Sequence, residues 1–127
     1  MEKQILNFKI LSDTEIGWLC DNKEVNLSFT HPVRCYHIQH RDEVVVIGDT
    51  NEFGPKNLIV YSADGTVRAR PKMPVLDKPV EGVYSVWFVE GKDKQNTILL
   101  SDNYAPYDTG CIVDFSTCEF SDFHPAK

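Results

Sequence analysis

Short runs of β-branched and aromatic residues recur along the whole chain, and turn residues separate them. Such runs favour strands, because branched and aromatic side chains pack well on a pleated surface. Helical periodicity is nearly absent, and three prolines predict an extended connector over residues 71–82. The pattern therefore predicts an all-β protein. The expected strands are Ile5–Leu11, Ile16–Cys20, Glu24–Phe29, Arg34–Gln39, Glu43–Ile47, Leu58–Ser62, Thr66–Arg70, Val83–Val89, Thr97–Ser101, Cys111–Phe115 and Glu119–Phe123.

Asp64 and Gly65 mark a hairpin between two of these strands. A two-residue turn of the mirror-image type needs positive φ at its centre, and glycine adopts that conformation at little steric cost. We therefore expect the strands on either side of this dipeptide to pair in antiparallel fashion.

Two stretches of the chain carry the same order of strands. Aligning Gly48-Asp49 with Ser101-Asp102 places residues 58–62 on residues 111–115, and an aromatic-bearing strand precedes each stretch. Each unit then has four strands in meander order, and the start of the chain resembles the outer hairpin of a third, incomplete unit. Repeats of four strands over about 40 to 50 residues are typical of β-propeller blades.

A chain of 127 residues fits one domain with one modest core. We predict a single all-β domain over residues 1–127, with units at approximately 1–30, 31–72 and 80–125. The predicted architecture is a partial, β-propeller-like arrangement of antiparallel meander units, and a β-sandwich or open barrel is the alternative. Because so few units cannot close a ring, their edges and faces stay open for self-association or for a partner.

The charge balance bears on the kind of partner. Thirteen Lys and Arg residues against nineteen Asp and Glu residues give a net charge of −6. This charge repels phosphate backbones and anionic membrane surfaces, so we expect no direct nucleic-acid or membrane binding and favour a basic protein. No apolar run approaches the roughly 18 residues of a membrane span and no secretion signal is evident, which predicts a cytoplasmic protein.

No residue pattern indicates catalysis or a cofactor. Cys35, His37 and His40 are ligand types that zinc accepts, but no second pair of ligands accompanies them, so we predict no metal site. The triplet at residues 64–66 resembles that of aspartic proteases, but the rest of that pattern is missing and a hairpin turn explains it. We expect no catalytic residues, no cofactor and no enzymatic activity. The four cysteines are expected to be mostly buried thiols.

Negative charge concentrates toward the C-terminal end. From residue 96 onward there are five acids and a single base, Lys127. Within this region residues 101–110 form a predicted long loop with two tyrosines and two aspartates, a composition that suits an interface. The corresponding loop of the preceding unit also mixes acids with an aromatic residue, and we expect both loops on the same side. The candidate partner-binding residues are Asp49, Glu52, Asp102, Tyr104, Tyr107 and Asp108, whereas Trp18, Trp87 and Phe88 are expected in the core.

Size, acidity, the absence of a catalytic pattern and the repeat over residues 34–123 make the chain resemble one class of bacterial protein. This class is the immunity proteins of contact-dependent growth inhibition and other polymorphic toxin systems. The resemblance implies a binding protein that neutralises a cognate cationic toxin by occluding its active site with an acidic surface. The kind of toxin that this implies first is a nuclease. It implies no particular functional residue, because these proteins share no motif.

Two other functions stay open. One is a small-molecule or carbohydrate-binding β domain, or a degenerate hydrolase, which calls for a concave pocket lined by Trp18, Trp87 or the histidines. The other is a subunit that completes a propeller by self-association. For the immunity role we expect a monomer or weak oligomer.

Overall fold

The computed structural model describes residues 4–74, 80–101 and 105–124. Within these residues the chain forms three antiparallel sheets, with one short α-helix and one 3-10 turn beside them. None of the three sheets closes into a barrel over the described residues. The all-β prediction is therefore confirmed, and each predicted strand overlaps an observed one, although β10 begins six residues before the predicted strand Cys111–Phe115.

Each sheet is a meander, because its strands pair in the order in which the chain makes them. The first sheet contains β1 (Leu6–Ser12), β2 (Glu15–Cys20) and β3 (Lys23–Ser28). The second contains β4 (Arg34–Ile38), β5 (Glu43–Ile47), β6 (Leu58–Ser62) and β7 (Val67–Ala69), with η1 (Gln39–Arg41) and α1 (Thr50–Phe53) in its connections. The third contains β8 (Val80–Trp87), β9 (Lys94–Ser101), β10 (Ala105–Asp114) and β11 (Glu119–His124).

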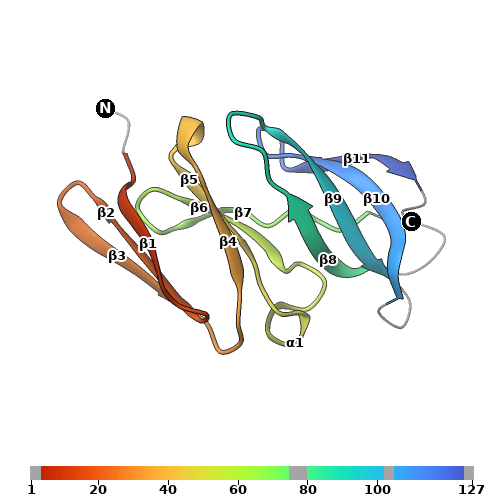
Figure 1. Cartoon of the computed structure of the whole chain (residues 1–127), viewed down its shortest axis with the longest axis horizontal. Helices are drawn as coiled ribbons and strands as arrows, with labels where there is room; N and C mark the ends of the chain where they lie inside the picture. The colour runs from red at the N-terminus through yellow and green to blue at the C-terminus, as the bar shows by residue number, and fades with distance from the viewer. Residues whose placement is uncertain (1–3, 75–79, 102–104, 125–127) are drawn as a thin grey trace.

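The three sheets stack side by side along the long axis of the molecule, with the second sheet in the middle (Figure 1). Both faces of this middle sheet are buried, and every residue of β5 is buried. Since successive side chains of a strand point to opposite faces, the apolar run of β5 and β6 supplies two cores. Val45, Ile47, Leu58 and Val60 pack toward the third sheet, and Val44, Val46, Ile59 and Tyr61 pack toward the first.

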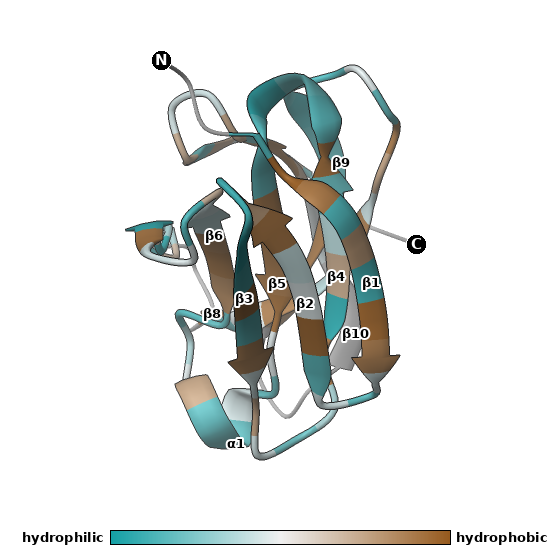
Figure 2. Cartoon of the chain, turned by 90° about the vertical axis from the view of Figure 1, so that its left-hand side faces the viewer, coloured by the Kyte–Doolittle hydropathy of each residue, from teal (hydrophilic) through white to brown (hydrophobic). Residues whose placement is uncertain are grey.

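The first sheet covers the middle one through apolar and polar contacts. Trp18 of β2 is 2% exposed and donates its indole N–H to the carbonyl oxygen of Ala63 at 2.6 Å. Figure 2 looks at the stack from this end, with β1, β2 and β3 in front of the strands of the second sheet. The prediction that Trp18 lies in the core is confirmed.

The hairpin at Asp64 and Gly65 is present, but its turn differs from the predicted one. The connection between β6 and β7 has four residues, Ala63 to Thr66, and within it only Gly65 has positive φ, at 89°. The Asp64 carboxylate accepts hydrogen bonds from the backbone and hydroxyl of Thr66. Glycine is also required by space, because a Cβ at this position would lie 2.7 Å from the Val25 side chain of the first sheet.

Charged side chains join the second and third sheets at the end opposite α1. The buried Glu43 carboxylate accepts from Arg41 Nε at 2.9 Å and pairs with the Arg68 guanidinium, which also donates to the carbonyl oxygen of Phe115 at 2.6 Å. Asp93, between β8 and β9, lies 2.7 Å from Nε2 of His40. Glu43 therefore neutralises the charges of Arg41 and Arg68, whose side chains are only partly exposed to solvent at this junction.

We expect Glu43→Gln to lower the free energy of unfolding by about 2–3 kcal/mol, because it removes the carboxylate of Arg68 and leaves Arg41 only the more distant Asp93 carboxylate at 3.7 Å. Urea unfolding followed by circular dichroism measures the change. Glu24→Gln, at an exposed position of β3, controls for the loss of one charge. A loss below about 1 kcal/mol, the size of an exposed ion pair, would show that this junction contributes little.

Candidate partner-binding surface

The predicted partner-binding residues fall on two connections of neighbouring sheets. Asp49 and Glu52 lie at α1, in the connection from β5 to β6. Asp102 and Tyr104 lie outside the described residues. Tyr107 and Asp108 belong to β10, of which the backbone alone is described at these positions. The partner-binding role of all six residues stays a prediction.

The long loop predicted over residues 101–110 is wrong for its second half. β10 begins at Ala105, which pairs with Ser101, and Thr109 pairs with Leu99. Four positions of β10 thus span two of β9, so the strand is irregular there. Pro106 and the polar residues around it resemble a loop in the sequence, but an irregular strand accommodates them without a ladder bond at each position.

The α1 connection is fixed by its own side chains. The Asp49 carboxylate caps the helix by accepting from the backbone N–H of Asn51 at 2.7 Å. Glu52 reaches back to the connection between β3 and β4, where its Oε1 accepts from the backbone N–H groups of Thr30 at 3.0 Å and His31 at 2.9 Å. Glu52 therefore ties the first sheet to α1, a role that the sequence did not indicate.

The Glu52 hydrogen bonds change its ionisation. Burial acts to raise the pKa of this carboxyl, but the N–H groups of His31 and Thr30 and the His31 ring outweigh burial and lower it. A carboxyl whose pKa is lowered by folding stabilises the folded state as long as it is ionised.

Arg70 holds the same connection from the other side. Its guanidinium lies 5.5 Å from the centre of the Phe53 ring and donates to the carbonyl oxygens of Phe53 and Lys56. Phe53 packs against Phe29 and lies over Gly48, where a Cβ would come within 2.3 Å of its ring. These contacts make α1 a preordered surface, which reduces the entropic cost of binding.

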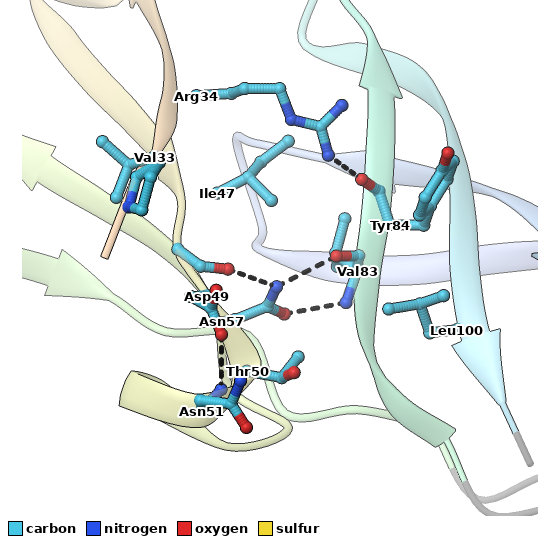
Figure 3. Close-up of a pocket in the computed structure, with 12 residues that line it drawn as sticks. Val33, Arg34, Ile47, Asp49, Thr50, Asn51, Asn57, Val83, Tyr84 and Leu100 are labelled. Atoms are coloured by element: carbon cyan, nitrogen blue, oxygen red, sulfur yellow. Dashed lines mark hydrogen bonds between the residues drawn. The ribbon is translucent and has the colours of Figure 1, made fainter. Parts of the chain in front are cut away.

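A groove of about 540 Å³ opens beside α1, between the second and third sheets (Figure 3). The side chain of Asn57 forms its floor. Asn57 is 1% exposed, donates to the carbonyl oxygens of Gly48 and Val83 at 2.9 Å each, and accepts from the N–H of Val83 at 2.7 Å. One buried amide thus joins the two sheets, and the groove has a rigid base.

The walls of the groove carry opposite charges. Asp49 and Thr50 lie on the α1 side, and Arg34 of β4 donates to the carbonyl oxygen of Tyr84, whose ring lies 5.8 Å from the guanidinium (Figure 3). Leu100, next to the end of β9, also lines the groove. The α1 connection and Leu100 near the end of β9 therefore line one groove, while residues 102–104 of the second predicted loop lie outside the described residues.

The candidate metal ligands separate in the structure. The ring of His37 packs on Phe8 with centroids 5.5 Å apart, whereas His40 contacts Asp93. Burial lowers the pKa of His37, with Asp42 and Glu90 acting in the opposite direction. In the part of the chain that the structure describes, no three His, Cys, Asp or Glu side chains are grouped as metal ligands would be.

The four thiols are buried to different extents, and Cys118 lies beside the Arg68, Glu43 and Arg41 side chains. Cys20 and Cys111 are buried, and Cys35 and Cys118 are half-buried. Burial raises the pKa of the Cys111 thiol to about 12, and burial also raises the pKa of Cys35 and Cys118. Since the thiolate is the reactive form, these thiols are poor nucleophiles and poor metal ligands at neutral pH.

The prediction that Trp87 lies in the core is wrong, although Phe88 packs on the core beside Tyr36. Val83 pairs with Leu99 and Ser85 pairs with Ile98, so β8 advances two residues while β9 advances one. This bulge at Tyr84 reverses the alternation that follows it. Val86 then points to the core and Trp87 to solvent, where it is 78% exposed.

No protein-family model and no curated protein matches the sequence. The structure is similar to a chain in the solved structure of Tne2 in complex with Tni2, with a TM-score of 0.64 and 11% sequence identity. The similarity covers 90% of this chain and 78% of that chain. It shows a shared fold over almost the whole molecule. Within the described residues, no helix is long and apolar enough to cross a bilayer.

We expect the stability difference between the wild type and Glu52→Gln to depend on pH. Because folding lowers the pKa of Glu52 below its usual value near 4.5, its contribution is present above that value and is lost as pH falls through the folded-state pKa. Urea unfolding at several values from about pH 6 to about pH 3 measures the difference. Glu15→Gln, at an exposed position of β2, is the matched control. A difference that stays constant over this range would contradict the bond pattern of Glu52.

Proposed function

We propose that this chain is an immunity protein that binds and neutralises a cognate cationic toxin. The observation that carries the proposal is the sign and position of its charge. The net charge is −6, and between Gln95 and Ala126 the sequence contains five acids and no Lys or Arg. The likeness to a chain solved as part of a two-protein complex supports a role in protein binding.

The physical basis is electrostatic complementarity. A nuclease needs a positive cleft to hold phosphates, so an acidic protein that mimics the substrate is attracted to that cleft and blocks it. We therefore propose a nuclease as the toxin, occlusion of its active site as the mode of inhibition, and the cytoplasm as the place where the two meet. More specifically, we propose that the toxin belongs to a system of contact-dependent growth inhibition.

The α1 side of the molecule is the proposed contact region. It carries Asp49, whose carboxylate caps α1, and Leu100 near the end of β9 lines the same groove. Asp102 and Tyr104 follow β9 in the sequence and are included in the proposal for their composition. Tyr107 and Asp108 follow in β10. Glu52 is the weakest of the six candidates, because one of its oxygens already accepts two backbone hydrogen bonds.

Ligand binding in a concave pocket is less well supported. Of the two tryptophans expected to line such a pocket, Trp18 is buried with its N–H bonded to Ala63, and Trp87 lies on an outer face. The groove beside α1 has Asn57, Asp49 and Arg34 along it, and these groups already bond to the protein. These contacts fit a preformed surface that binds a protein better than a pocket that binds a small molecule.

The proposal predicts that the gene beside that of this chain encodes a protein with a basic, toxic C-terminal domain. Production of that domain in a bacterium should stop growth, and co-production of this chain should restore it. The purified domain and this chain should form a complex whose association rate falls as salt is added. Growth arrest that co-production of this chain does not relieve, or absence of a complex between the two purified proteins, would contradict the immunity role.

The charge of the proposed contact region is tested by Asp102→Lys plus Asp108→Lys. We expect the association rate at low ionic strength to fall about tenfold, because the cationic toxin is no longer attracted to this side. The control is Asp13→Lys plus Glu24→Lys in the first sheet, which changes the net charge by the same amount at exposed positions. Stopped-flow mixing measures the association rate of each double variant with the toxin. An equal decrease in both would show that the proposed contact region contributes no more than any other acidic part of the surface.

A further inference from the structure

The outer face of the third sheet is the end of the stack, and no other sheet formed by the described residues covers it (Figure 1). Residues that pair directly across antiparallel strands share a face. Trp87 pairs with Asn96, Asn96 with Ile112, and Ile112 with Ser121, so this row crosses all four strands. The adjacent inward row, which includes Val86 and Cys111, belongs to the core. We define the outer face by Trp87, Asn96, Ile112, Ser121, Ser85 and Ile98.

The composition of this face is typical of an interface. Apart from Trp87 these six side chains are small, amide or aliphatic, whereas Lys94, Asp114 and Glu119 pair in the next row of the same face and the His124 ring lies over Gly110. Trp87 stands at the β8 edge with 78% of its surface exposed, while Ile98 and Ile112 are half-buried beside it. A large exposed aromatic side chain beside half-buried aliphatic side chains is characteristic of binding hot spots.

The charges around the face indicate which kind of partner it binds. Glu119 and Asp122 of β11 are exposed, and Lys94 at the start of β9 lies opposite Asp114. β10 and β11 contain no Lys or Arg. A second copy docked through the same face would set two surfaces of the same net negative charge against each other, because Asp114, Glu119 and Asp122 outnumber Lys94. A surface with Lys or Arg side chains meets opposite charge, and such a side chain can also stack on the Trp87 ring.

We propose that the outer face of the third sheet is the main docking surface for the cationic toxin, with Trp87 as its anchor. This inference rests on the proposed immunity function and adds the place and chemistry of the contact. The partner residue that contacts the Trp87 ring is an arginine or lysine.

The two tryptophans allow a direct test by ¹⁹F NMR. The chain is labelled with 5-fluorotryptophan and titrated with the unlabelled toxin domain encoded beside its gene, in a catalytically inactive form. Trp87→Phe assigns the two resonances. We expect the Trp87 resonance to shift and to lose its sensitivity to exchange of H₂O for D₂O, while the buried Trp18 resonance stays in place.

Affinity measurements test the anchor and the sign of the partner's charge. Trp87→Ala should weaken binding about tenfold or more, whereas Val67→Ala, at an exposed position of β7, should not. Asn96→Lys should weaken binding more than Asn96→Glu, because both replace the same exposed amide beside Trp87 with charges of opposite sign. Unchanged melting temperatures show that these surface variants are folded.

The outcomes separate the docking surface from the immunity function. If the wild type does not bind the toxin domain, the proposed function fails and this inference fails with it. If it binds but the Trp87 resonance is unchanged and Trp87→Ala binds normally, the docking surface is wrong while the immunity function stands. A free protein that light scattering shows to be a dimer with Trp87 already protected would assign the face to a second copy.

Discussion

The arrangement of the molecule depends on a middle sheet whose two faces are both buried. Because alternate residues of β5 and β6 enter different cores, neither the first nor the third sheet can be removed without exposing half of these side chains. This requirement fixes three stacked layers instead of two. It also leaves the outer faces of the first and third sheets without a covering sheet among the described residues. The docking surface proposed above is the outer face of the third sheet.

Polar contacts fix how the sheets sit on one another. Apolar side chains bring the layers together without specifying a register, whereas a buried group must find its partners. Asn57 at one end of the junction and Glu43 at the other provide these partners between the second and third sheets. Glu52 does the same between the first sheet and α1. The proposed contact region is thus built on connections whose positions are fixed before a partner arrives.

The sequence predicted the strands well because each strand is short, apolar and bounded by turn residues. The bounds of β5 and β6 match the prediction, since their apolar runs begin and end with the buried part of the middle sheet. Features that depend on contacts with distant parts of the chain could not be predicted from the local sequence. The exposure of Trp87 follows from a bulge that only pairing with β9 reveals, and the bonds of Glu52 come from a connection twenty residues earlier. The strand at residues 105–110 forms because β9 offers it a ladder, which overrides the local preference of Pro106.

The order of the sheets along the chain has a consequence for biosynthesis. Each sheet consists of consecutive strands, so it can assemble as soon as its own segment leaves the ribosome. Until residues 80–124 follow, however, Val45, Ile47, Leu58 and Val60 have no layer above them. The emerging chain therefore presents an apolar surface for about the second half of its synthesis, which is the interval in which aggregation is most favoured.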